Sequence, residues 1–548
     1  MASAKRGNGQ DREAARLQLV RQLQRLEPKE RLEALIDAPG AAALVRSVPP
    51  EQLYLDIRSV GLADTTDVVQ LASPSQFQAF VDLGAWKGDR LDHHALLDWI
   101  RAARGEDAAA FQAQVSGLDL ELIESLFRAH TVIHDLEEEP DLHVEGLTLD
   151  SADGRYRVEF LAENVADQMA LRTLLLDFMA VDALGLSRLL ESARWALPSE
   201  LEEVAYGFRS ARLTDLGFPD PETARSLYAR VALPAPPAEA TTTVLARGAK
   251  ERTDLLASAL EALTADERQN LEDELRTVVN AVLVDERADP GDPAALRRAS
   301  ERARDTLELG LEYLSSGSPA RAVDVVRQET SRHVFQVGFT LSLQLKHRAD
   351  RLVHRPLVRL DGEYLLWPDV AAAVVELRRP RPLRALKVEG AEAVPFRSLR
   401  EVHETESLLG RAEHQAALFA ALLGGTDKAA RAALATLGPD WPVGGMPAVL
   451  LAALGHAAVE GALQVAPLQR AQLRALGAAL LEGEPDAPRI RKETRDRLVG
   501  AFQALAPGSA EEAARLVDAG LEKLLADVGP ALARGELPKE ASTVLPFR

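Results

Sequence analysis

The sequence predicts a mainly α-helical protein of several domains, and two patterns support this prediction. Apolar residues recur at the three- and four-residue spacing of amphipathic helices, as at Leu120, Ile123 and Phe127. Helix starts are marked by side chains that can bind the free N–H groups of a first helical turn. Such starts are Ser73-Pro74-Ser75-Gln76, Thr264 with Glu267, and Ser509 with Glu512. The chain has 548 residues, enough for about three or four domains.

Three similar segments begin with proline: Pro50-Glu51-Gln52-Leu53, Pro74-Ser75-Gln76-Phe77 and Pro198-Ser199-Glu200-Leu201. We expect each of them to begin a helix. Helices that restart in this way are typical of stacked α-hairpins, which would form a superhelical array in the N-terminal part. The alternative is that proline followed by polar residues is simply a common helix start.

Two segments alternate apolar and polar residues and predict small β-hairpins. In the first, the turn-forming residues 151–154 separate Leu142–Leu149 from Tyr156–Phe160. In the second, within Leu357–Trp367, the turn is Asp361-Gly362, a pair that adopts the positive φ angles of a tight hairpin. Each hairpin is too small to be stable alone, so we expect both to pack on helices.

Changes in composition predict five parts of the chain. The segment LPAPPAEATTT at 233–243 is rich in proline and favours an extended linker. From about residue 424 the sequence becomes rich in Ala and Leu, which is typical of a helical bundle. The predicted parts are a helical array (1–140), a β-hairpin with helices (141–232), the linker (233–243), a central mainly helical domain with a β-hairpin (244–423), and a helical bundle (424–548).

Composition also limits the classes of function. The chain has no cysteine, which excludes disulfides, thiolate metal sites and cysteine nucleophiles. The first ten residues lack the apolar stretch of a secretory signal, and together these features predict a cytoplasmic protein. The apolar runs Met446–Val465 and Met169–Leu186 are interrupted by charged residues or proline, so we expect no stable membrane insertion and predict that the first is a buried helix.

Motifs that bind nucleotides or mark an esterase nucleophile are absent from the sequence, and we predict no cofactor. The candidate metal ligands are His130 and His134. On one helix, residues four apart project from the same face, as two imidazole ligands of a divalent ion require. The acidic residues that follow could add oxygen ligands. The alternative is a solvated acidic loop that holds no metal.

A basic segment stands out in an acidic chain. Residues 341–390 carry a net charge of +4, whereas the whole chain carries −20. The candidate anion- or partner-binding residues are Arg378, Arg379, Arg381, Arg384 and Lys387. We expect this basic island to neutralise acidic helices of the same chain or to bind a protein, because the charge elsewhere repels phosphate polymers. Nucleic acid is therefore not an expected partner.

The segment Arg12–Arg31 is predicted to form a basic amphipathic helix. Such a helix could lie on anionic lipid. Its apolar side lacks Trp and Phe, so packing on the following helices is the preferred interpretation.

Four stretches resemble a known family. They are Leu53-Tyr54-Leu55 through Val60-Gly61-Leu62, Trp86 to Leu91, Ala205 to Arg209 through Leu216 to Pro219, and Val337-Gly338-Phe339 through Lys346 and 348–350. The sequence resembles an uncharacterised family of large bacterial proteins, known as a domain of unknown function, and this resemblance implies no activity. The N-terminal helices are also similar in pattern to the cytosolic helical superhelix of magnesium transporter regulatory domains, which implies a ligand only by analogy.

The leading functional hypothesis is a cytoplasmic, non-enzymatic scaffold or adaptor that binds another protein through its curved N-terminal array. It rests on the repeated helix starts, the multidomain helical plan and the missing cofactor motifs. The competing hypothesis is a metal-dependent hydrolase or a metal-sensing regulatory protein that uses His130 and His134. Neither hypothesis specifies the partner, the substrate or the oligomeric state.

Overall fold

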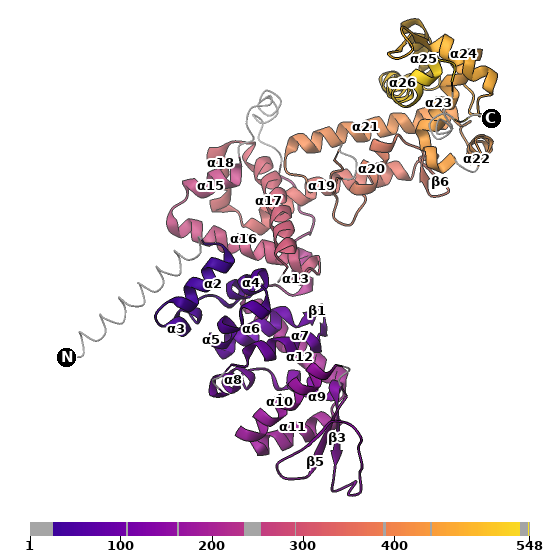
Figure 1. The fold of residues 1–548 in the computed structure, drawn as a ribbon. Coiled ribbons are helices and arrows are strands. Elements are labelled where there is room, and N and C mark those ends of the chain that lie inside the picture. Colours follow the sequence, from indigo (N-terminus) through magenta and orange to yellow (C-terminus); the bar gives the residue numbers. More distant parts are fainter. Residues whose placement is uncertain are drawn as a thin grey trace. The chain divides into compact units, whose positions relative to one another are not determined.

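The computed structural model describes residues 26–105, 108–161, 164–234, 254–290, 292–386, 391–438, 441–536 and 546. Helices dominate these residues and the strands are short, which confirms the predicted mainly α fold (Figure 1). The chain divides into two compact units. Unit 1 contains Met1–Tyr228 and Arg268–Ala303, and unit 2 contains Ala229–Glu267 and Arg304–Arg548. Every helix in the described part is too short or too polar to cross a bilayer.

Unit 1 consists of short helices that pack on one another, with a small sheet near α9. Its elements are α2 (Pro28–Asp37), α3 (Ala41–Val45), α4 (Pro50–Val60), η1 (Leu62–Asp64), α5 (Thr66–Leu71), α6 (Pro74–Gly84), β1 (Trp86–Lys87), β2 (Arg90–Leu91), α7 (His93–Ala103), α8 (Ala108–Val115), α9 (Leu120–His130), β3 (Thr131–Asp135), β4 (Thr148–Asp150), β5 (Tyr156–Phe160), α10 (Val165–Val181), α11 (Ala183–Trp195), α12 (Pro198–Asp215) and α13 (Pro221–Ser226). Two long helices, α16 (Ala265–Asp285) and α17 (Pro293–Ser315), have residues in both units.

Unit 2 contains α15 (Leu255–Ala262), α18 (Pro319–Gln328), α19 (Ser331–Val353), β6 (Arg359–Leu360), β7 (Glu363–Tyr364), α20 (Pro368–Leu377), α21 (Leu399–Leu422), α22 (Asp427–Thr436), α23 (Trp441–Glu460), α24 (Arg470–Leu480), β8 (Leu481–Glu482), β9 (Arg489–Ile490), α25 (Lys492–Gln503), η2 (Pro507–Ser509) and α26 (Ala510–Ala533). Side chains of α21 and α23–α26 form one apolar core. Val449 and Leu450 of α23 are fully buried in it, which confirms the prediction that this apolar run is an interior helix.

Both predicted hairpins are present, and the first is larger than predicted. β4 and β5 pair in antiparallel fashion, and β3 pairs with the other edge of β5, with Thr131 opposite Phe160 and Asp135 opposite Tyr156. The second hairpin pairs β6 with β7. Its turn residues Asp361 and Gly362 have φ angles of 51° and 96°, as the Asp-Gly pattern predicts.

Two of the three predicted capping pairs are confirmed. Ser73 and Gln76 exchange reciprocal hydrogen bonds at the start of α6, and Thr264 and Glu267 do so before α16. The pair Ser509–Glu512 is wrong, because both side chains bind other partners. The Ser509 hydroxyl lies 2.9 Å from Nδ1 of His414. Glu512 accepts hydrogen bonds from the side chains of Arg411 and Gln415.

All three proline-initiated segments begin helices, namely α4, α6 and α12, as predicted. A superhelical repeat built from them stays a prediction, as does the division of the chain into five parts. Most of the predicted linker, residues 235–243, lies outside the described residues. So does most of the predicted helix at Arg12–Arg31, but Arg31 belongs to α2, which begins only at Pro28.

Helices α17 and α19 cross at two glycines of unit 2. A Cβ atom at Gly310 would overlap the carbonyl oxygen of Val334, and a Cβ atom at Gly338 would overlap that of Thr306. No side chain can move away to relieve these overlaps, because the obstructing atoms are backbone. The crossing distance therefore depends on glycine at both positions.

We expect Gly338→Ala to lower the free energy of unfolding by about 3 kcal/mol, since overpacking at a rigid contact forces the helices apart. Chemical denaturation of the purified protein measures this. Gly500→Ala is the matched control, because Gly500 lies on an exposed helical face of unit 2 with no neighbour near its Cβ position. It should instead raise stability by about 0.5–1 kcal/mol. Equal effects of the two substitutions would contradict the close crossing.

Candidate functional site

The structure separates the two histidines proposed as a metal pair. His130 is the last residue of α9, and Thr131 already has the extended φ and ψ angles of β3. His134 lies within β3, where its Nε2 is 3.2 Å from Oε2 of Glu159 on β5. The expectation that both project from one helix is therefore wrong. Within the described residues, no group of three or more His, Asp or Glu side chains is arranged to hold a metal ion.

His130 instead meets two histidines from the start of α7. Its ring centroid lies 5.3 Å from that of His93 and 5.8 Å from that of His94. Nε2 of His93 is 2.9 Å from the hydroxyl of Ser125, and Nε2 of His130 is buried without a hydrogen-bond partner. His93 and His94 are adjacent on α7, so their side chains point apart. The ring of His130 lies close to both, and the three histidines therefore form one cluster.

Burial keeps two of these histidines neutral near pH 7. Desolvation, helped by the neighbouring His130, lowers the pKa of His93 to about 4. Desolvation also lowers the pKa of His130, and proximity to His94 adds to this. A buried imidazole that would have to lose its water to become charged prefers the neutral form. His93 and His130 therefore pack α7 against α9 as neutral rings.

Asp167 of α10 connects this cluster to the next helix. Its carboxylate is almost fully buried and lies 2.9 Å from Nδ1 of His94 and 3.1 Å from Nη2 of Arg101, both on α7. Its backbone N–H also donates to the side chain of Asn164, which caps α10. Because a buried carboxylate requires such partners, Asp167 fixes the orientation of α10 on α7.

The orientation fixed by Asp167 leaves an apolar stripe on the outer face of α10. Leu171, Leu174 and Leu175 are buried on the inner side. On the outer side, Val165 is 73% exposed, Met169 45% and Leu176 37%. We define these three residues and Arg172 as the α10 stripe, because their positions fall within about 60° around the helix axis.

Arg172 gives this stripe an unsatisfied polar group. Its Nε is buried and has no hydrogen-bond partner. A buried donor without an acceptor costs about 1–3 kcal/mol. The α10 stripe therefore combines exposed apolar side chains with an arginine, two residue types that are enriched in protein interfaces.

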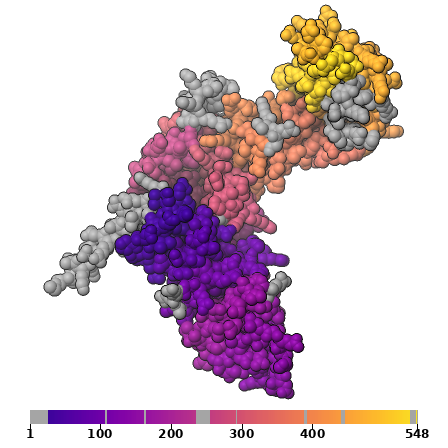
Figure 2. Space-filling view, viewed as in Figure 1, coloured from indigo at the N-terminus to yellow at the C-terminus, as the bar shows by residue number. Residues whose placement is uncertain are grey.

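Exposed apolar side chains are concentrated around this stripe in the sequence. Among the residues that the structure describes, fourteen large apolar side chains are exposed, and twelve of them lie between Leu120 and Phe208. Three of the twelve belong to the α10 stripe, and the other nine are Leu120, Val132, Leu161, Val181, Leu184, Trp195, Leu197, Val204 and Phe208. Figure 2 shows this part of unit 1 in violet to magenta. Single exposed apolar residues are ordinary, but this segment holds most of those in the described part of the chain.

The described arginines of the basic island contact other residues of unit 2. Arg378 pairs with Asp350 at 2.8 Å, Arg379 with Glu376 at 2.6 Å, and Arg384 with the buried Glu401 at 3.1 Å. The guanidinium carbon of Arg381 lies 5.9 Å from the centre of the Phe339 ring. Lys387 lies outside the described residues. These contacts fit an internal role for the island, and anion or partner binding there stays a prediction.

The sequence contains a signal for the α10 stripe that motif searches do not detect. The run Met169–Leu186 has too many charged residues to cross a membrane, yet its apolar residues occupy both faces of a helix. Apolar residues on both faces are typical of a helix that is covered on both sides. The contacts of Asp167, His94 and Arg101 have no such signal, because 66–73 positions separate the partners.

Comparison with known proteins gives one match. The model of a family of unknown function, DUF6178, matches residues 9–548. No curated protein and no solved structure matches the chain.

The histidine cluster predicts a loss of stability in acid. The pKa of His93 is about 4 in the fold and about 6.5 in an unfolded chain, so the unfolded chain binds more protons between these values. Stability is therefore complete above about pH 6.5 and falls as the pH decreases. From pH 7 to pH 5 we expect His93 to account for a loss of about 2 kcal/mol.

Urea denaturation of the wild type and of His93→Gln at both pH values measures this loss. Gln can keep a hydrogen bond to Ser125 but does not titrate, so the variant should lose about 2 kcal/mol less than the wild type. His354→Gln, a change in unit 2 at an exposed helix end, should leave the wild-type loss unchanged. Equal losses in wild type and His93→Gln would contradict the assignment.

Proposed function

The chain belongs to the family of unknown function DUF6178, and we propose that it is a cytoplasmic adaptor that binds another protein through the α10 stripe. The observation that carries the proposal is an outward apolar face on a helix whose inner face is already packed. The missing cysteines are compatible with the cytoplasm. The alternative metal-dependent functions lack a ligand cluster in the described residues.

The side chains of the stripe offer substantial binding energy. Complete burial of an exposed Val, Leu or Met contributes about 1.5–3 kcal/mol each. Val165, Met169 and Leu176 are only partly exposed, so burial of all three in an interface contributes about 3 kcal/mol. A few such residues dominate the binding energy of many interfaces, so the stripe could serve as the central anchor of a larger contact.

The chemistry of the stripe defines the partner. The cationic Arg172 lies on the same face of α10 as Met169 and Leu176, so the face carries one positive charge among apolar residues. We propose that the partner presents an amphipathic helix with a carboxylate in the middle of its apolar face. Such a helix covers the stripe and accepts a charge-assisted hydrogen bond from Arg172.

We expect Val165→Thr combined with Met169→Gln to abolish partner binding without unfolding the protein. Both side chains are well exposed, and substitutions at such positions change stability by about 0.5 kcal/mol or less. The measurement is affinity capture with the tagged chain and quantitative mass spectrometry. A specific set of proteins should be lost with the double variant and with Arg172→Gln.

The matched control is Val375→Thr on α20, where Val375 is 44% exposed. It should capture the same proteins as the wild type. Identical captured sets for wild type and stripe variants would contradict the proposal. Concentration-dependent self-association that only the stripe variants abolish, measured by sedimentation, would show that a second copy covers the stripe and would also contradict it.

A further inference from the structure

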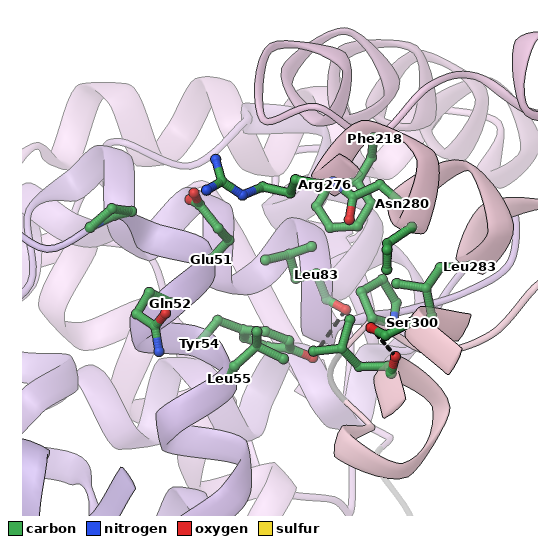
Figure 3. A pocket seen from close by; sticks show the side chains of 14 residues that line it. Glu51, Gln52, Tyr54, Leu55, Leu83, Phe218, Arg276, Asn280, Leu283 and Ser300 are labelled. Carbon is green, nitrogen blue, oxygen red and sulfur yellow. Dashed lines mark hydrogen bonds between the residues drawn. The ribbon is translucent and has the colours of Figure 1, made fainter. Parts of the chain in front are cut away.

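Unit 1 contains a pocket that is separate from the α10 stripe. Its volume is about 350 Å³, at the small end of the range for small-molecule sites (Figure 3). Residues of α4, α16 and α17 line it, together with Leu83 and Phe218. Every lining residue belongs to unit 1, so the pocket depends on the packing within this unit alone.

Most of the pocket wall is apolar. Tyr54, Leu83, Phe218 and Leu283 are all buried to more than nine-tenths. The hydroxyl of Tyr54 donates to the carbonyl oxygen of Leu83 at 3.1 Å, which holds the Tyr54 ring in place in the pocket wall. This part of the pocket fits an aliphatic or aromatic group of a few carbon atoms.

Two opposite charges lie at one end of the pocket. Figure 3 shows the side chains of Glu51 and Arg276 pointing toward one another there. Oε2 of Glu51 is buried and has no hydrogen-bond partner. Arg276 donates from Nη1 to Asp273 at 3.1 Å, and its side chain is 58% exposed. A buried carboxylate oxygen without a donor is costly, and a hydrogen-bond-donating ligand group beside this carboxylate would offset part of the cost.

Glu51 lies at a favourable position for a carboxylate. It lies in the first turn of α4, where the free N–H groups and the helix dipole stabilise negative charge. An ammonium group is the donor that compensates such a carboxylate best. The guanidinium of Arg276, with its five N–H groups, provides a matching site for a carboxylate.

We propose that this pocket binds an apolar α-amino acid. The α-ammonium group would pair with the carboxylate of Glu51, the α-carboxylate would accept from Arg276, and the side chain would lie against Tyr54, Leu83 and Phe218. An α-amino acid carries both charges on one carbon, which matches two opposite charges at the same end of an apolar cavity. This inference is independent of the α10 stripe.

Isothermal titration of the full chain tests the proposal with four probes. L-Phenylalanine should bind. Phenethylamine lacks the carboxylate, 3-phenylpropanoate lacks the ammonium group and glycine lacks the side chain. Each of these three should bind about tenfold or more weakly, since a hydrogen bond to a charged group or an apolar contact is lost. Equal binding of phenethylamine, or no binding of phenylalanine at about 10 mM, would overturn the assignment.

Variants locate the site. Glu51→Gln and Arg276→Gln should each weaken phenylalanine binding about tenfold or more, because each removes one charge from the pocket. The matched controls are Glu272→Gln and Arg298→Gln, exposed residues on α16 and α17 that do not line the pocket. They should bind as the wild type does. Unchanged affinity in Glu51→Gln would overturn the proposal, and its thermal unfolding midpoint verifies that the variant is folded.

Discussion

One buried carboxylate, that of Asp167, determines which face of α10 points outward. A carboxylate away from water needs charged or polar partners, and His94 and Arg101 of α7 provide them. Both partners lie on one side of α10. A rotation of the helix that buried Met169 would leave the carboxylate unpaired at a cost of several kcal/mol, more than the apolar stripe could recover. The outward stripe therefore follows from a polar contact on the opposite face.

Local patterns in the sequence were sufficient for most of the fold. The capping box at Ser73 and the turn at Asp361-Gly362 involve only neighbouring residues, so their sequence signals are reliable. The predicted box at Ser509 fails because Arg411 and His414, far away in the sequence, bind its side chains. The sequence does not predict strand β3. The strand directly follows α9, and the four-residue spacing of His130 and His134 favours a helix there instead.

The candidate site was less predictable, because it depends on contacts between distant residues. The spacing of His130 and His134 indicated a metal pair only under the assumption of one continuous helix. In the structure the helix ends at His130, and this residue meets His93 and His94. The apolar character of α10 was visible in the sequence, but which of its faces is exposed depends on Asp167. The pocket behind Glu51 combines α4 with helices about 230 positions later, a distance at which sequence periodicity carries no information.

The central claim is that another protein covers the outer face of α10. Site-specific photo-cross-linking tests it most directly, with a benzophenone amino acid at position 169 and, as the reference, at position 375 of α20. The account predicts that irradiation of cells joins the chain from position 169, but not from position 375, to one other protein, through a helix that bears a carboxylate in its apolar face. Cross-links only to copies of the same chain, or the same products from both positions, would contradict it.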